Sequence, residues 1–338
     1  SKMDPTSMHW LQISRFTLFI FGLLAFVYAT ASGWPQYGNL GGQQYTSLNQ
    51  INLYNLNQLE EVWRFRTGDL GQGFKRKGHS MQANPILWNG TLYVSTSANW
   101  VIAIDALTGA EQWRFDPKLP KDIGYSSSAS RGVSIWHGNA QVCPSRIFLG
   151  TLIGELIALD ARTGKLCSDF GDNGRVDLSR GVGSVELGEY SITSPPAILG
   201  ELVIVGSAIG DNRATKLERG IVRALDAQSG SIKWLWDPIP KSPTDRASAT
   251  WSSQSNLNTG AANAWAPLTA DHSSGLIFVP TSSPSPDFFG GERLGDNLYS
   301  NSIGALDGAT GEIVWFQQLV HHDVWDYDLP AQPTLTTI

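Results

Sequence analysis

The chain has 338 residues, with 24 Lys and Arg against 30 Asp and Glu and a formal net charge of −6. Its 41% hydrophobic and 16% charged content exclude a disordered chain or a coiled coil, which need more charge and fewer large apolar groups. The mild acidity offers no basic patch for nucleic acid, so no nucleic-acid partner is expected. Counts of 13 Trp and 35 Gly beside 2 Cys favour an all-β fold of repeated hairpins.

The N-terminus has the pattern of a secretory signal peptide that starts at Met8. Arg15 precedes an uncharged apolar run over residues 16–29, and the small residues of Ala29-Thr30-Ala31 follow as a cleavage site. The alternative is a retained membrane anchor, but the run is shorter than the roughly 20 residues that a spanning helix prefers. We therefore expect residues 1–31 to be a leader that is removed on export.

Export would place Cys143 and Cys167 in an oxidising compartment, here the periplasm. The segment between them reads as a strand, a tight turn at Ile153-Gly154 and a returning strand, which could bring its two ends together. We expect a Cys143–Cys167 disulfide, with two free thiols as the alternative. Association of the exported protein with the membrane is left open.

A phrase of apolar–Ala–apolar–Asp–x–x–Thr/Ser–Gly, followed by an aromatic residue, recurs along the chain. Its alternating apolar residues predict a half-buried strand, and Asp–x–x–Thr–Gly predicts a tight turn with Gly at positive φ. Trp113, Trp234 and Trp315 share one offset, four residues after their Gly, whereas the second copy departs and has Cys167 three residues after its Gly. Trp63 resembles the closing half of an earlier copy. The copies cover residues 102–113, 157–170, 222–234 and 303–315.

Further strand candidates precede the phrases, one of them a hairpin at Asn89-Gly90, and bring each unit to about four strands. A lone hairpin cannot bury its apolar face, so an array of such units predicts the blades of a β-propeller. The spacing of the motif aspartates gives about four to five blades in one domain over residues 32–338. The longest insertions, at residues 241–262 and 284–300, are expected to help build the functional site.

The repeated phrase and several other segments together resemble the quinoprotein dehydrogenases that use pyrroloquinoline quinone (PQQ). WPQYGNLGGQQYTSLNQIN resembles their N-terminal signature, and other segments resemble the membrane-type glucose dehydrogenase branch. These segments are RGVS (131–134), TSPP (193–196), GSAIGDN (206–212), NAWAP (263–267) and HHDVWDYDLPAQP (321–333).

The resemblance implies an eight-bladed propeller with PQQ and Ca²⁺, or another divalent ion, on its axis. It also implies that a glucose-like sugar or an alcohol is oxidised and that electrons pass to a quinone acceptor. On this reading the chain is roughly the N-terminal half of the propeller, truncated at the C-terminus, and is expected to be inactive alone.

The resemblance assigns Asp326 as the catalytic base beside the metal, because removal of hydride from carbon requires a carboxylate to take the hydroxyl proton. Asp211 and Asn212 match metal ligands, and adjacent carboxylate and amide oxygens suit a hard cation. Asp328 matches an extra metal carboxylate of lanthanide-using relatives but is common in the sugar branch, so no lanthanide is inferred. Ser283 stands where many relatives carry a metal-binding Asn, and its hydroxyl is a weaker ligand.

The remaining assignments concern the cofactor. Trp265 resembles the indole on which the flat PQQ ring lies, and Arg131 resembles a fork donor to a PQQ carboxylate. Gln82, Thr193 and Ser207 match positions that hydrogen-bond the cofactor. Without the resemblance, these would read as blade-core and turn residues.

A function of another class also fits a propeller. The chain could be a non-catalytic scaffold that binds protein partners in the cell envelope. Asp326, Trp265 and the Asp211-Asn212 pair favour the enzyme, because a scaffold has no reason to combine all of them.

Overall fold

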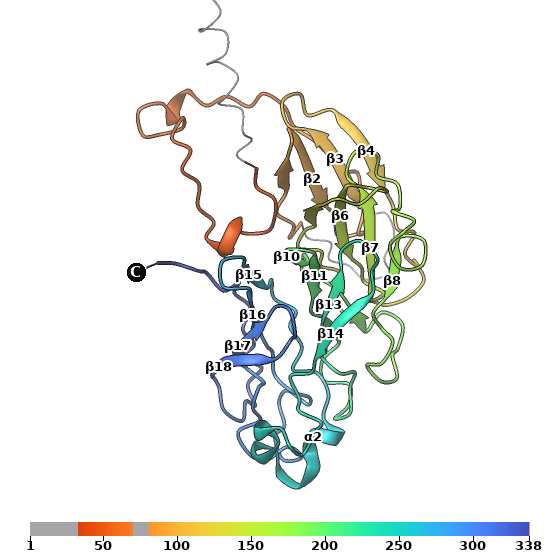
Figure 1. Ribbon diagram of the computed structural model, residues 1–338, viewed down its shortest axis with the longest axis vertical. Coiled ribbons are helices and arrows are strands. Elements are labelled where there is room, and N and C mark those ends of the chain that lie inside the picture. Colours follow the sequence, from red (N-terminus) through yellow and green to blue (C-terminus); the bar gives the residue numbers. More distant parts are fainter. Residues whose placement is uncertain (1–32, 70–80, 338) are drawn as a thin grey trace, which may run out of the picture. The chain divides into compact units, whose positions relative to one another are not determined.

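The computed structural model describes residues 33–69 and 81–337, which form an almost wholly β structure (Figure 1). Four sheets of four antiparallel strands follow one another along the chain, and within each sheet the strands are neighbours in sequence order. The all-β fold of propeller blades is therefore confirmed, with four blades in the described residues. The leader expected at residues 1–31 lies outside them.

The strands of the four sheets have the following bounds. The first sheet contains β1 (Ile86–Trp88), β2 (Thr91–Ser95), β3 (Val101–Asp105) and β4 (Glu111–Phe115). The second contains β5 (Ser134–His137), β6 (Ser145–Gly150), β7 (Glu155–Asp160) and β8 (Arg175–Asp177). The third contains β10 (Ala197–Leu199), β11 (Leu202–Val205), β13 (Val222–Asp226) and β14 (Ile232–Trp236). The fourth contains β15 (Thr269–Asp271), β16 (Leu276–Pro280), β17 (Ser302–Asp307) and β18 (Ile313–Gln318).

The remaining elements are short. A two-stranded sheet pairs β9 (Tyr190–Ser191) with β12 (Ala208–Ile209). The helical turns are η1 (Leu40–Gly42), η2 (Leu56–Gln58), η3 (Arg246–Thr250), η4 (Ser252–Gln254) and α2 (Ser255–Asn258). No helix in the described part of the chain is long and apolar enough to cross a membrane.

Each copy of the repeated phrase forms the third strand of a sheet and the turn after it, as predicted. In the first copy the Asp105 carboxylate accepts hydrogen bonds from the backbone N–H groups of Leu107 and Thr108 at 3.1 and 2.8 Å, and from the Thr108 hydroxyl at 2.7 Å. These bonds hold the pKa of Asp105 below its usual value. The turn glycine adopts a positive φ in every copy, at Gly109, Gly164, Gly230 and Gly311.

Tryptophan side chains lock three of these four turns to the preceding part of the chain. Trp113 of the first sheet covers Gly164 in the second, where a Cβ atom would lie 2.5 Å from the ring, and its Nε1 donates to the Ala161 carbonyl at 3.0 Å. Trp234 of the third sheet covers Gly311 in the fourth, with Nε1 donating to the Gly308 carbonyl at 2.8 Å. Only glycine leaves room for the indole at these turns. Trp63 covers Gly109 of the first sheet in the same way, although no strand is assigned around Trp63.

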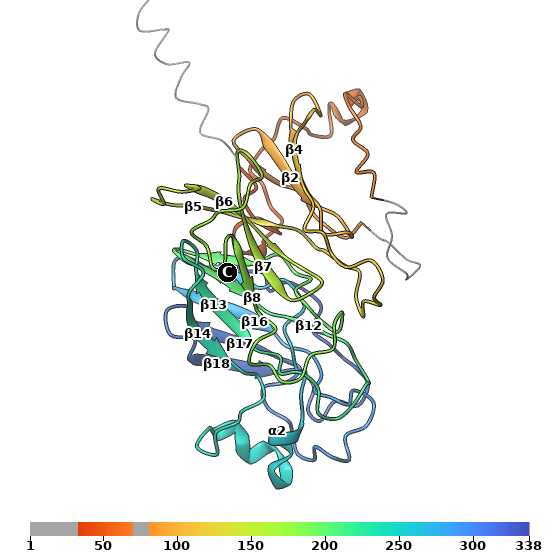
Figure 2. The same ribbon diagram turned by 90° about the vertical axis from the view of Figure 1, so that its right-hand side faces the viewer.

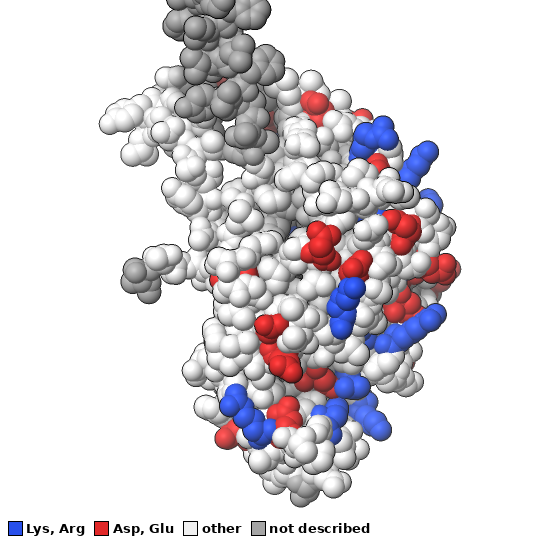
Figure 3. All heavy atoms as spheres, in the orientation of Figure 1, with Lys and Arg blue, Asp and Glu red and all other residues white. Residues whose placement is uncertain are grey.

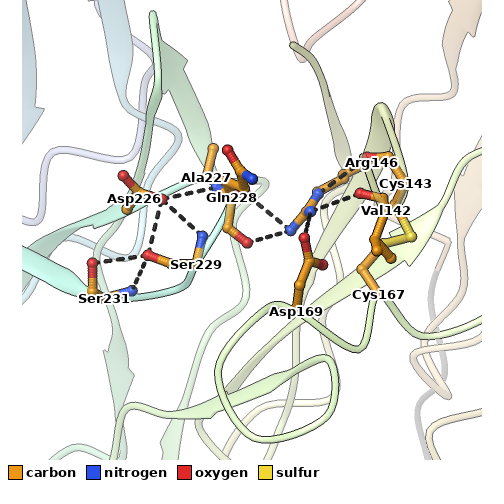
Figure 4. A network of polar contacts seen from close by, with 10 residues as sticks. All are labelled: Val142, Cys143, Arg146, Cys167, Asp169, Asp226, Ala227, Gln228, Ser229 and Ser231. Atoms are coloured by element: carbon orange, nitrogen blue, oxygen red, sulfur yellow. Dashed lines mark hydrogen bonds and ion pairs between the residues drawn. A yellow bond between two sulfur atoms is a disulfide. The ribbon is translucent and has the colours of Figure 1, made fainter. Parts of the chain in front are cut away.

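The joint between the second and third sheets has a different construction, because Cys167 lies opposite Ala158, as Trp113 lies opposite Ala103 in the first sheet, and its N–H donates to the Ala158 carbonyl at 3.0 Å. A disulfide links Cys167 to Cys143, and the fully buried guanidinium of Arg146 on β6 fills the joint (Figure 4). Arg146 Nη1 donates to the Ala227 and Gln228 carbonyls of the third sheet, at 3.2 and 2.5 Å. Arg146 therefore makes the bond to the carbonyl after the motif aspartate that an indole N–H makes at the neighbouring joints.

Other contacts tie Arg146 back to its own sheet. Its Nη2 donates to Asp169 Oδ2 at 2.6 Å and to the Val142 carbonyl at 2.9 Å, and its Nε donates to the Cys143 carbonyl at 3.2 Å. All of its donor groups are thus bonded within the protein, which offsets the cost of burying the charge.

The inner sheets are buried on both faces. Along β7, Leu156 and Ala158 join the apolar cluster shared with the third sheet, whereas Ile157 and Leu159 join the cluster shared with the first. Successive strand residues point to opposite faces, so a strand between two sheets needs a continuous apolar run. In Figure 2, β13 and β14 lie beside β16 and β17, and one core cluster joins these sheets.

Antiparallel order brings particular chain segments to one end of the sheets. The start of the first strand, the end of the second and the end of the fourth all lie at the same end. The long insertions gather here, where Trp251 Nε1 donates to the Leu298 carbonyl at 2.6 Å and the Asn297 N–H donates to the Thr250 carbonyl at 3.2 Å.

The Arg146 joint yields a test of stability. We expect Arg146→Met to lower the free energy of unfolding by about 3–5 kcal/mol, because it leaves buried carbonyls and Asp169 without a donor. Arg162→Met, at an exposed position in a turn of the same sheet, is the matched control. Urea unfolding followed by tryptophan fluorescence measures both. Equal stability of the two variants would contradict the role given to Arg146.

Candidate functional site

A pocket of about 270 Å³ opens at the end of the sheets where these segments meet. Its walls come from the segments before β5, β10 and β15 and from those after β12, β16 and β18. The lining residues are Ser126, Ser127, Arg131, Thr193, Ala208, Ile209, Gly210, Asp211, Asn263, Trp265, Ser282, Ser283, Asp287, Asp326 and Asp328. The second, third and fourth sheets thus share one site.

A flat aromatic and cationic surface forms one part of the pocket. The Arg131 guanidinium lies over the Trp265 ring, 4.7 Å from its centroid, and its Nη1 donates to Thr193 Oγ1 at 2.7 Å. Burial lowers the pKa of Arg131, but the usual pKa of a guanidinium is so high that the group stays charged. An indole face, a guanidinium and a hydroxyl together suit a planar anion.

Four acidic side chains line another part of the pocket. Burial first, and repulsion by the other carboxylates second, raise the pKa of Asp211, Asp326, Asp287 and Asp328. The pKa of Asp287 rises to about 7; that of Asp328 rises to about 6, although it accepts two hydrogen bonds. Arg131 is the one cationic side chain among the lining residues, so the described walls carry an excess of negative charge.

The loop that carries Asp326 is built around Asp323, which is 1% exposed. The Asp323 carboxylate accepts from the backbone N–H groups of Trp325 and Tyr327 at 3.1 and 2.8 Å, and its carbonyl accepts from Arg293 Nη2 at 2.6 Å. These bonds curl the loop and place Asp326 at a φ of 60°, in the left-handed region that non-glycine residues seldom adopt. Such conformations persist where surrounding contacts enforce them, often at functional sites.

Asp328 connects this loop to the aromatic surface. Its Oδ2 accepts from Trp265 Nε1 at 2.6 Å, and its Oδ1 accepts from the Ser283 N–H at 2.8 Å. The Ser283 hydroxyl donates to Asp323 and accepts from Asn301 Nδ2 at 3.0 Å. Asp328 therefore positions the indole, and the Ser283 hydroxyl is used by bonds within the protein.

Several residues singled out from the sequence do not line the pocket. Gln82 has an exposed side chain outside it. Asn212 is exposed and adopts a φ of 54°, while Asp211 beside it lines the pocket. Ser207 is 1% exposed, and its hydroxyl has no hydrogen-bond partner in the described chain. Their assignments remain predictions.

Asn263 and Asp287 are among the polar lining residues that the sequence analysis did not assign. Asn263 lies inside the NAWAP segment, and its Nδ2 donates to the Ser207 carbonyl at 2.8 Å. Asp287 follows Ser283 by four positions in a Pro- and Ser-rich stretch. This stretch runs into the insertion at residues 284–300 that was expected to help build the site, so a carboxylate there could have been recognised as a candidate.

The pocket fits the groups that the resemblance implies. Arg131, Trp265 and Thr193 offer stacking and donor groups to PQQ, and the excess of carboxylates requires a cation for charge balance. Within the described residues no three His, Cys, Asp or Glu side chains are grouped closely enough to hold a metal ion by themselves. A cation here would need mixed donors, including amide, carbonyl or water oxygens. The face in Figure 3 carries interspersed acidic and basic side chains.

Comparison with known proteins identifies relatives over nearly the whole chain. Residues 34–338 match the family described as PQQ: Glucose/ethanol/alcohol dehydrogenase, β-propeller domain. The chain is 36% identical over 315 residues to quinoprotein glucose dehydrogenase of Escherichia coli (strain K12), covering 90% of this chain and 39% of that protein. It is 35% identical over 324 residues to quinoprotein glucose dehydrogenase A of Acinetobacter calcoaceticus, covering 91% and 40%.

A solved structure agrees with these matches. Quinohemoprotein alcohol dehydrogenase from Comamonas testosteroni is similar with a TM-score of 0.73 and 29% identity, over 89% of this chain and 43% of that chain. The chain spans about 40% of the length of the curated relatives it matches.

The raised pKa of Asp287 predicts a pH dependence of stability. An unfolded Asp loses its proton near pH 4, whereas Asp287 in the folded protein holds its proton until about pH 7. The folded state therefore binds more protons in this window, so its stability falls as pH rises through it and the penalty is complete above about pH 7. Asp287→Asn removes the ionisable group, so its stability relative to the unmodified protein should increase from about pH 4 to about pH 7.

Urea unfolding in chelator at several pH values measures this difference. Asp122→Asn, at an exposed position outside the pocket, is the control and should show a difference that does not change with pH. A difference for Asp287→Asn that is equally constant would contradict the raised pKa.

Proposed function

Because the chain belongs to the PQQ-dependent glucose/ethanol/alcohol dehydrogenase β-propeller family, we propose that the protein oxidises a CH–OH group of a sugar or alcohol and passes the electrons to a quinone. The observation that carries this proposal is the pocket itself. It brings Asp326 and Asp211 together with the Arg131–Trp265 pair, although these residues come from segments far apart in the sequence.

Asp326 is the base in this proposal. Its carboxylate lines the pocket and is half-buried, which leaves it accessible to a substrate hydroxyl. The ionised carboxylate accepts the hydroxyl proton while the hydrogen on the adjacent carbon leaves with its electron pair. Because burial and the neighbouring carboxylates raise the pKa of Asp326, a nearby cation favours the ionised form that the reaction needs.

The remaining residues bind and orient the cofactor and the cation. PQQ, when bound, supplies the two-electron acceptor that amino-acid side chains lack. Trp265 provides the stacking surface, Arg131 and Thr193 provide donors for carboxylate oxygens, and Asp328 holds the indole in place. Asp211, Asn212 and Asp326 are the proposed ligands of Ca²⁺ or another divalent ion.

A glucose-like sugar is the proposed substrate. The segment HHDVWDYDLPAQP resembles the sugar-oxidising branch, and both curated relatives named above are glucose dehydrogenases. The loop that carries Asp326 supports a sugar as well, because Trp325 and Tyr327 stand on either side of Asp326 in sequence and have 71% and 62% of their surfaces exposed. Exposed aromatic faces suit the apolar faces of a sugar ring.

We propose further that the protein is exported to the periplasm, where it acts at or near the membrane. The signal-peptide pattern that starts at Met8 supports export. The Cys143–Cys167 disulfide also supports it, because such bonds persist in oxidising compartments.

Asp326→Asn tests the catalytic assignment. In the full-length protein reconstituted with PQQ and Ca²⁺, we expect turnover of glucose to fall by about 10²–10⁴-fold, because the amide cannot accept the proton. PQQ binding, followed by quenching of tryptophan fluorescence, should persist. Asp296→Asn, at an exposed position in a neighbouring loop, is the control and should keep its turnover. Near-normal activity of Asp326→Asn would remove Asp326 as the base.

A thiol count tests the proposed compartment. Protein isolated from the periplasm and denatured without reductant should react with no thiol reagent, and after reduction it should react at Cys143 and Cys167. Two reactive thiols before reduction would contradict both the disulfide and the argument for export that rests on it.

A further inference from the structure

Asp287 is a buried carboxylate for which the proposed mechanism has no use. It is 3% exposed and lines the pocket, and its Oδ2 has no hydrogen-bond partner among the described residues. No ion pair to it is present in that part of the chain either. A buried carboxyl group without a hydrogen-bond partner is costly even when it is neutral, so this side chain requires a physical explanation.

The other acidic side chains of the site are accounted for. Asp328 accepts from Trp265 and from the Ser283 N–H, and Asp323 accepts from two backbone N–H groups. Asp211 has Arg213 nearby, which lowers its pKa against the effect of burial. Asp287 alone is both deeply buried and unbonded.

Arg293 does not bond to Asp287. Its positive charge attracts Asp287, but its terminal nitrogens donate to Asn297 Oδ1 at 2.9 Å and to the Pro286 and Asp323 carbonyls at 3.0 and 2.6 Å. The guanidinium thus braces the loops on either side of the pocket. The carboxylate of Asp287 is left facing the other carboxylates without a contacting cation.

The backbone before Asp287 is firmly held. Ser285 Oγ donates to the Thr215 carbonyl at 2.5 Å and accepts from the Gly260 N–H at 3.1 Å, and the Pro286 carbonyl accepts from Arg293. Two other loops and a bond within its own loop therefore hold Asp287 at the wall of the pocket. An orphaned carboxylate that the fold holds so firmly is expected of a ligand.

We propose that Asp287 helps to hold the cation at this site through a cation-bound water, beside Asp211, Asn212 and Asp326, because no three acidic side chains of the described residues lie close enough to bind one ion directly. This inference rests on the proposed function. Ca²⁺ takes six to eight oxygen ligands in flexible geometry, water among them, and a cation-bound water can donate a hydrogen bond to the Asp287 carboxylate. The Ser283 hydroxyl is already bonded to Asp323 and Asn301, which leaves this role to Asp287.

The test measures cation binding and metal-free stability in the same variants. In the full-length protein stripped with chelator, Asp287→Asn should weaken Ca²⁺ binding by about tenfold or more in calorimetric titration with CaCl₂, with and without PQQ. When Ca²⁺ is absent and the pH is above about 7, where Asp287 is ionised, the same variant should melt at a higher temperature than the unmodified protein, because it removes an uncompensated buried charge. Asp122→Asn should change neither quantity.

Opposite signs distinguish a ligand from a structural residue. Lower metal-free stability together with unchanged Ca²⁺ affinity would overturn the proposal, as would unchanged affinity alone. If Asp287→Asn does not fold, Asp287→Ser, which is neutral and smaller, takes its place with the same expected signs.

The failure of this inference is separable from failure of the proposed function. If the unmodified protein binds Ca²⁺ and Asp211→Asn loses it while Asp287→Asn does not, only the role of Asp287 is wrong. If the unmodified protein binds no Ca²⁺ even with PQQ present, both fall together.

Discussion

The contact between an indole and the glycine turn of the next sheet is the interaction on which the described fold depends. Each sheet is too small to bury its own apolar faces and must lie against its neighbours. Trp113 and Trp234 hold that arrangement by covering Gly164 and Gly311 and by bonding the carbonyl beside each turn. Because the indole leaves no space for a Cβ atom, the glycine is needed both for its positive φ and for its missing side chain.

The functional pocket inherits its geometry from these joints. Arg131 precedes the second sheet, Thr193 precedes the third and Trp265 precedes the fourth, so their mutual contacts depend on how the three sheets are held together. The joint between the second and third sheets lacks the tryptophan and uses Arg146 with the Cys143–Cys167 disulfide instead. A buried guanidinium is more demanding than an indole, since each of its donors must find an acceptor, and the extra bonds to Asp169 and Val142 meet that demand.

Local patterns predicted most of the fold and part of the site. The strands and turns followed from alternation and from Asp–x–x–Thr–Gly, because both act within a few residues. Asp326, Asp211 and Trp265 line one pocket, since their segments all follow or precede strands at the same end. Arg146 and Asp287 could not be recognised in this way. Their importance arises from burial and from missing or distant partners, which no short stretch of sequence contains.

The charge balance of the pocket links these observations. Four carboxylates with raised pKa values face one guanidinium, so the described walls alone repel a polyanionic cofactor. A divalent cation changes the sign of that interaction, because it attracts the carboxylates and the cofactor at once and lowers the pKa of each carboxyl group near it. The same ion that would ionise Asp326 for proton removal would also relieve the burial cost of Asp287. On this proposal, binding of the cation, binding of the cofactor and competence of the base would be coupled through one electrostatic centre rather than arise from three independent sets of residues.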